Sequence, residues 1–424
     1  MIDVFWLREL WSIFRRVLLV LILLTLLGRS SLAFHEPVER VRRLSNPYEF
    51  DFLGWTLAAA MDKSAHVVLG TSHFLEEGQR EAVVRRYLEL IGKIQSTRTD
   101  LEAAYGDPDP TRSAAEVERI GTELAQLKAA AESLRPIAEA ILQEQVAFVL
   151  AELELGLAGF IFPPVAFQFA QLPYSLIISP RDVIRQDASI SLRVDLPLDE
   201  KVALELQVER NEGVSALAVP VGGLGTYPTM VLESTALSWI SEVTAHEWVH
   251  NYLTFRPLGL NYGANPELRT MNETTASLIG VAVGREVLVR YYPDFLPPPT
   301  PTASTVAPSE PPAFDFRAEM RITRLRADEL LAQGEIVAAE AYMEQRRLYF
   351  WENGYRIRKL NQAYFAFHGA YADEPGGAAG DDPVGESVRR LWDRSSTPAD
   401  FLRTMAWLNS YDDLLKELRL PLRD

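Results

Sequence analysis

The feature that most constrains this sequence is a pair of histidines, His246 and His250, in the segment HEWVH. The stretch around them, residues 234–253, has the pattern of a helix, with Ser234 or Thr235 as candidate N-cap. Residues four apart on a helix project from one face, one turn above the other, so both imidazoles can reach one metal ion. Glu247 follows His246 directly and can touch a metal-bound water without being a ligand. The segment therefore predicts a helix that bears two metal ligands and a base.

A second helix is expected at about residues 266–291, after a turn rich in proline and glycine. Zinc needs a third protein ligand and leaves one position for water. The candidates in this segment are carboxylates: Glu267, Glu273, Glu286 and Asp294. Glu273 shares a side of the helix with Ser277, Gly280 and Gly284, and small residues along a stripe allow close approach of two backbones. Glu273 is therefore the predicted third ligand.

The two segments together resemble the gluzincin group of zinc metallopeptidases, which use HExxH on one helix and a glutamate on the next. The likeness covers residues 234–285, where 22 residues separate His250 from Glu273 in the segment NETTA. It implies Zn²⁺ bound by His246, His250 and Glu273, with Glu247 as general base in the hydrolysis of peptide or protein substrates. Ser277 stands where the group often has an acidic residue. The edge-strand glutamate motif of its aminopeptidases is missing, which weakens the case for aminopeptidase activity but not for peptidase activity.

The composition of the chain excludes several other classes of function and of metal site. The chain has no cysteine, which excludes thiol catalysis, disulfides and cysteine-type zinc sites. Its net charge of -16 argues against nucleic-acid binding. A purely structural zinc site is disfavoured, because such sites normally close with four protein ligands. The main alternative is a catalytically silent, zinc-binding membrane scaffold that binds a protein partner through a helical hairpin; the intact Glu247 favours the enzyme. The oligomeric state is not predicted.

The N-terminus has the pattern of a membrane anchor or signal segment over residues 1–34. Arg8, Arg15 and Arg16 precede an apolar run of 11 residues, 17–27, whereas a full span needs about 20. A cleaved signal peptide and an uncleaved anchor both fit, and Trp6 and Trp11 favour the anchor. We therefore expect a single-pass membrane protein with its catalytic part outside the cytoplasm, or a secreted protein after signal cleavage.

The rest of the chain predicts an α+β fold that is mainly helical. Residues 35–165 are expected to form a helical hairpin or stalk, broken at 106–110. Short runs with alternating apolar residues or many β-branched residues predict strands at 175–179, 190–196, 202–208, 214–221 and 227–232. With the two helices they make a zincin-like catalytic unit, residues 166–296, in which the strand at 227–232 is expected to be an edge that aligns a peptide. A Pro/Thr/Ser-rich linker or loop, 297–312, leads to a C-terminal helical region, 313–424, that completes the unit.

One segment of that C-terminal region has an unusual polar face. Residues 355–371 are predicted as one helix, on which Asn361, Tyr364, His368 and Tyr371 recur on a single face. Such a face can simply fill core with its polar tips satisfied locally. Alternatively it forms the wall opposite the zinc, with Tyr371 or His368 donating to the oxyanion of the reaction.

Overall fold

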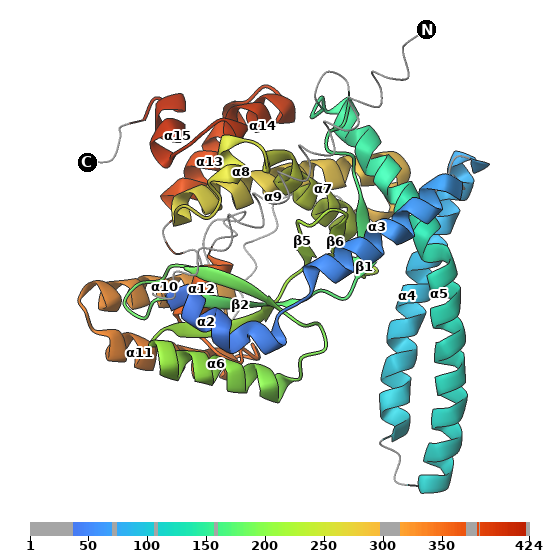
Figure 1. The fold of residues 1–424 in the computed structure, drawn as a ribbon, viewed down its shortest axis with the longest axis horizontal. Coiled ribbons are helices and arrows are strands. Elements are labelled where there is room, and N and C mark those ends of the chain that lie inside the picture. The colour runs from blue at the N-terminus through green and yellow to red at the C-terminus, as the bar shows by residue number, and fades with distance from the viewer. Residues whose placement is uncertain are drawn as a thin grey trace, which may run out of the picture.

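The computed structural model describes residues 37–69, 74–105, 109–156, 160–296, 314–369, 380 and 382–420. Within these ranges the fold is α+β and mainly helical, which confirms the predicted class. Two three-stranded sheets are present, and helices surround them (Figure 1). Two lobes stand one above the other in Figure 1, and a long helical hairpin projects beside them.

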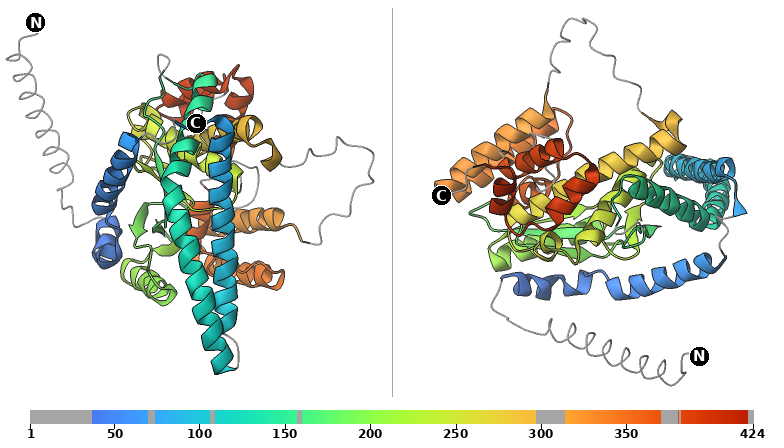
Figure 2. Two further views of the ribbon diagram at one scale, coloured as in Figure 1. Left: turned by 90° about the vertical axis from the view of Figure 1, so that its right-hand side faces the viewer. Right: turned by 90° about the horizontal axis from the view of Figure 1, so that it is seen from above.

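The hairpin consists of two antiparallel helices, α4 (Glu77–Tyr105) and α5 (Pro110–Glu152). Asp109 caps α5 by accepting hydrogen bonds from the backbone N–H groups of Thr111 and Arg112. At 1.5 Å per residue, the 43 residues of α5 extend roughly 65 Å. Figures 1 and 2 show one end of the hairpin projecting and the other packed on the upper lobe.

The upper lobe is built on two helices, α7 (Leu237–Leu253) and α9 (Pro266–Tyr291), joined through the short α8 (Pro257–Leu260). Asn265 caps α9 by accepting from the N–H of Leu268, which fixes where this helix begins. The remaining elements of the lobe are η3 (Pro293–Phe295), α13 (Pro383–Arg394), α14 (Pro398–Ala406), α15 (Tyr411–Glu417) and the strands β1 (Phe167–Ala170), β5 (Gly223–Leu224) and β6 (Thr229–Leu232). The sheet order is β1-β6-β5, with β1 parallel and β5 antiparallel to β6.

The lower lobe contains an antiparallel sheet of order β3-β2-β4. Its elements are β2 (Tyr174–Ser179), β3 (Ala188–Leu192), β4 (Ser215–Pro220), α2 (Pro37–Ser45), η1 (Asn46–Tyr48), α6 (Leu198–Glu212), α10 (Phe316–Ala332), α11 (Ile336–Glu352) and α12 (Gln362–His368). Side chains alternate along β2. Leu176 and Ile178 face a core shared with α2 and α6, whereas Ile177 packs against Ala363 of α12. Helix α3 (Phe52–Leu69) follows α2 along one side of the molecule (Figure 2).

Three local predictions were wrong. Residues 202–208 lie in helix α6, not in a strand; Leu204 and Val208 are buried one turn apart, and Leu206 is exposed. The strand near 227–232 is β6, which lies in the middle of its sheet, so that β1 and β5 are the edges. Residues 355–371 do not form one helix: α12 begins only after Asn361, which caps it by accepting from the N–H of Tyr364.

The predicted location also needs correction. Within the described ranges, no helix combines the length and apolar character needed to cross a lipid bilayer. This finding contradicts the expected single pass through a membrane with the catalytic part on its outer side. The anchor or signal segment predicted at residues 1–34 lies outside the described residues.

Candidate metal centre

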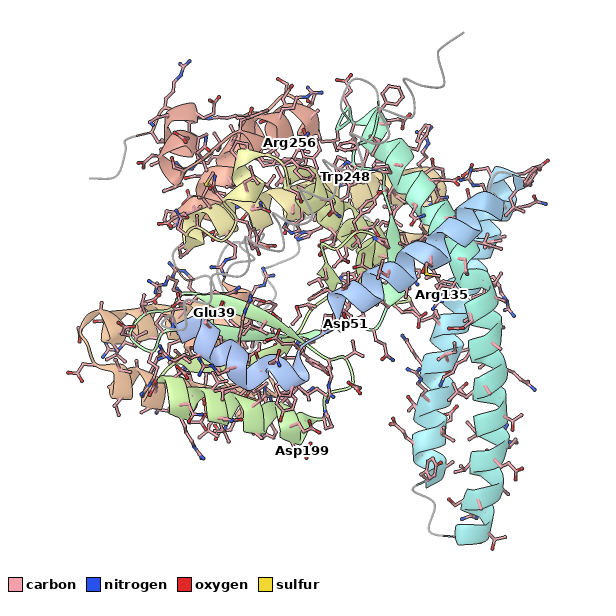
Figure 3. The ribbon with its side chains drawn as sticks, in the orientation of Figure 1. Glu39, Asp51, Arg135, Asp199, Trp248 and Arg256 are labelled. Atoms are coloured by element: carbon pink, nitrogen blue, oxygen red, sulfur yellow. The ribbon has the colours of Figure 1, made fainter. Side chains whose placement is uncertain are left out.

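Helix α7 brings the two histidines together. His246 and His250 are one turn apart, and their Nε2 atoms lie 3.0 Å from each other. The helix begins at Leu237, three residues later than expected, and the hydroxyl of Ser234 accepts from the N–H of Ala236 just before it. Trp248, labelled in Figure 3, anchors the helix by donating from Nε1 to the carbonyl oxygen of Pro163 at 2.7 Å.

Glycines on α9 let the two helices approach closely. A Cβ on Gly280 would lie 2.9 Å from the carbonyl oxygen of Glu242 and 3.2 Å from the Cβ of His246. On Gly284 it would lie 2.9 Å from the backbone nitrogen of Glu242. The stripe of small residues therefore faces α7. It brings Oε2 of Glu273 to 3.5 Å from Nε2 of His246 and 3.6 Å from Nε2 of His250.

The three donor atoms fit a zinc ion. Ligands about 2.0–2.1 Å from zinc in a tetrahedron are about 3.3 Å apart, and the observed separations of 3.0, 3.5 and 3.6 Å lie around that value. Oε2 of Glu273 is buried and has no hydrogen-bond partner in the structure, although buried polar atoms are normally paired. A cation between the three residues would satisfy it.

The charges of these groups are complementary. Burial alone would raise the pKa of Glu273, but the nearby imidazoles of His250 and His246 hold it well below its ordinary value. Burial works against a charge on His250, yet Glu273 raises the pKa of this imidazole to about 9. The Glu273 carboxylate and the His250 imidazole thus favour opposite charges and are both buried.

Further contacts orient the three side chains. Nδ1 of His250 donates to Oδ1 of Asn272 at 2.8 Å, and the amide of Asn272 donates to the carbonyl oxygen of Leu258 at 3.3 Å. With Nδ1 engaged by Asn272, Nε2 is the nitrogen that His250 offers to a metal once its proton is lost. The hydroxyl of Tyr262 donates to Oε1 of Glu273 at 2.5 Å. Ser277 is at the limit of hydrogen-bond distance from Nδ1 of His246, at 3.5 Å.

Glu247 is buried beside the histidines and against strand β5. A Cβ on Gly223 would lie 2.5 Å from its Oε1, and one on Gly225 would lie 3.3 Å from its Oε2. Burial raises the pKa of Glu247; His250 and His246 lower it and Glu273 raises it further. The carboxyl is therefore packed closely without itself joining the group of three donors.

These residues line a cavity of about 520 Å³, within the usual size range of small-molecule sites. Its upper wall comes from α7, α8, α9 and β5, and its lower wall from β2, β3 and α12. His246, Glu247, His250 and Glu273 all line it. The cavity therefore opens between the two lobes, with the three donor atoms in one wall.

The two predicted oxyanion donors, His368 and Tyr371, are not among the residues that line the cavity in the part of the chain that the structure describes. From α12 it is Phe367 that lines the cavity; the ring of His368 packs at a tilt against that of Tyr364, with ring centroids 4.3 Å apart. Tyr371 lies outside the described residues. Sequence reasoning missed Tyr262, Asn272, Gly223 and Arg269 as residues of this region. The NETTA segment contains Asn272, but no pattern singled out the other three.

Comparisons with family models, curated proteins and solved structures give no match. The gluzincin resemblance therefore depends on the two-helix motif, residues 234–285, alone.

Proposed function

We propose that this chain is a zinc-dependent peptidase of the gluzincin type, which hydrolyses peptide bonds with a glutamate as general base. The observation that supports this most strongly is the triangle of donor atoms from His246, His250 and Glu273, in which a buried carboxylate oxygen has no other partner. A structural site would need a fourth protein ligand. Here the fourth side opens into the cavity, beside Glu247.

Each of these residues has a separate role in the proposed hydrolysis. His246, His250 and Glu273 hold the metal, and Asn272 and Tyr262 orient two of them. A bound zinc ion supplies Lewis acidity, which polarises the scissile carbonyl and lowers the pKa of water to about 7. Glu247 takes a proton from the attacking water and passes it to the leaving amine.

Strand β5 is suited to align the substrate. It is one of the two edge strands of its sheet, and Gly223, Leu224 and Gly225 line the cavity together with Glu247. An extended peptide can pair with such an edge through backbone hydrogen bonds. We therefore assign the alignment of the peptide to β5 instead of the strand expected at 227–232. Oxyanion stabilisation by His368 or Tyr371 stays a prediction.

The test combines metal analysis with digestion of a broad peptide library. The unaltered protein should bind about one zinc ion per chain and cleave some of the peptides. Glu247→Gln should keep the zinc and lose hydrolysis, because the residue is the base and not a ligand. His246→Ala, His250→Ala and Glu273→Ala should lose the zinc itself.

Glu267→Ala, on the first turn of α9, is the matched control for the third ligand and should leave zinc content unchanged. Loss of zinc in Glu267→Ala but not in Glu273→Ala would contradict the ligand assignment. Zinc binding with no hydrolysis of any library peptide would favour the silent scaffold, with the hairpin of α4 and α5 as its binding surface.

A further inference from the structure

A buried arginine shares a cavity with the three donor residues. Arg269 is on α9, one helical turn before Glu273, and it lines the same cavity. The residue is only 8% exposed. Its Nη2 donates to the carbonyl oxygen of Gln186, from the loop before β3, at 3.2 Å. Its Nη1 is buried and has no hydrogen-bond partner.

The charge of Arg269 lacks a counterion in the part of the chain that the structure describes. Other half-buried arginines here have one: Arg358 pairs with the buried Glu205, and Arg346 with Glu319. Burying a guanidinium without a carboxylate partner costs free energy that neutral hydrogen bonds recover only in part. A cation kept in this state in the wall of a cavity is suited to bind an anion that enters it.

The facing wall adds hydroxyl groups. Ser175 of β2 and Ser189 of β3 line the cavity, and their Oγ atoms are 2.5 Å apart. Arginine recognises carboxylates with two parallel hydrogen bonds, and hydroxyl donors nearby can supplement them. Apolar neighbours such as Ile177 and Phe367 line the same space and fit the rest of a peptide.

We propose that Arg269 binds a carboxylate of the substrate, an inference that rests on the proposed peptidase function. The carboxylate is either the free C-terminus of a peptide or an aspartate or glutamate side chain. Four residues of helix correspond to about 6 Å between Arg269 and Glu273, and an extended peptide advances about 3.3–3.6 Å per residue. We therefore expect the carboxylate to lie within a few residues of the scissile bond.

The experiment measures binding of four versions of one fluorescein-labelled hexapeptide. Its C-terminus is either free or amidated, and its penultimate residue is either glutamate or glutamine. Each is titrated into the zinc-loaded Glu247→Gln protein, which binds without cleaving, and into the metal-free protein. Loss of the recognised carboxylate should weaken binding on the order of 10- to 100-fold, and the pair of peptides that differs identifies its source.

Arg269→Gln in the same background should bind all four peptides about equally. Arg285→Gln removes the same charge from an exposed position on α9 and should keep the preference. Equal binding of the four peptides to the protein with Arg269 intact, or a preference that survives Arg269→Gln, would overturn the inference and leave the peptidase proposal standing. If the unaltered protein neither binds nor cleaves any of the four or any library peptide, both proposals fail.

Discussion

The hydroxyl of Tyr262 donates a hydrogen bond of 2.5 Å to Oε1 of Glu273, while Oε2 of the same carboxylate points to the two imidazoles. Tyr262 comes from the loop between α8 and α9, so this loop fixes the rotation of a side chain on the following helix. The carboxylate is thereby held with one oxygen occupied and the other available for a metal.

Tyr262→Phe should therefore weaken zinc binding by about 10-fold or more, because outer contacts of this kind contribute roughly 10- to 100-fold to metal affinity. Tyr262 is 36% exposed, so the fold should be unaffected. Competition with a chromophoric chelator gives the affinity. Tyr227→Phe is the control, since it removes an exposed hydroxyl that donates to the carbonyl oxygen of Pro164. Equal zinc affinity in the two variants would show that Tyr262 does not position Glu273.

Gly223→Ala should reduce hydrolysis strongly while zinc content stays near that of the unaltered protein. The added methyl would lie 2.5 Å from Oε1 of Glu247 and 2.8 Å from Cγ1 of Val243, so the base must move. A displacement of about 1 Å at a catalytic group can cost on the order of 100-fold in rate.

Gly263→Ala is the matched control for this variant. It lies in the loop before α9, where a Cβ meets nothing within 4 Å. Turnover of a library peptide and zinc analysis are measured for both variants. Full activity in Gly223→Ala would mean that Glu247 tolerates displacement, which is incompatible with its role as a positioned base.

The site follows from the sequence more closely than the fold around it does. Helical periodicity places His246 and His250 on one face, and the small residues at 280 and 284 indicate which side of the second helix approaches the first. Both signals are local, and the bounds of α9 agree with the expected range of residues 266–291. The motif depends on the spacing of residues within two helices that are adjacent in the sequence. This spacing can be read from the sequence alone.

Other elements depend on contacts between distant segments. Val202, Leu204, Leu206 and Val208 alternate as in a strand, but the segment is a helix because Leu204 and Val208 meet the core of the lower lobe. Across the cavity, Arg269 of α9 donates to the carbonyl oxygen of Gln186, which is 83 positions away in the sequence. No sequence periodicity predicts a contact between residues so far apart. The cavity and the burial of Arg269 could therefore not be predicted from the sequence.

Glu139 predicts a pH dependence of stability far from the metal centre. It is buried on α5, accepts from the N–H of Phe169 at 2.8 Å and pairs with Lys63 of α3. Burial raises its pKa, although Lys63 and the N–H of Phe169 act in the opposite direction. Below pH about 4.3, the ordinary pKa of glutamate, the carboxyl is protonated in both the folded and the unfolded state. Between that pH and the folded-state pKa, the unfolded chain releases the proton first, so the free energy of unfolding falls as the pH rises.

Glu139→Gln has no such proton. Relative to the unaltered protein, its thermal midpoint should therefore rise as the pH increases from about 4 toward neutrality. Melting curves of the two proteins at several pH values measure this difference. Glu132→Gln removes a carboxylate from an exposed position on the same helix and controls for the general change in charge. A difference between Glu139→Gln and the unaltered protein that does not vary with pH would contradict the raised pKa.

The close contact of α7 and α9 predicts an unusual response to alanine. In an exposed helix interior, glycine to alanine stabilises by about 0.5–1 kcal/mol. Gly121→Ala on α5, where a Cβ meets nothing within 4 Å, should show this gain. At Gly284 the Cβ would lie 2.9 Å from the backbone nitrogen of Glu242 and 3.0 Å from its Cα, atoms that cannot turn aside.

Gly284→Ala should therefore destabilise the protein by about 1–3 kcal/mol, the usual cost of overpacking a well-packed interior. Because the helices must separate, Glu273 should also move away from the imidazoles, and zinc affinity should fall together with stability. Denaturant unfolding of the metal-free protein gives the first quantity, and chelator competition gives the second. Removing the metal from the unfolding experiment keeps the two effects apart, because a ligand that binds the folded state alone would otherwise raise its apparent stability. A stability gain equal to that of Gly121→Ala would show that the two helices are not in contact at Gly284.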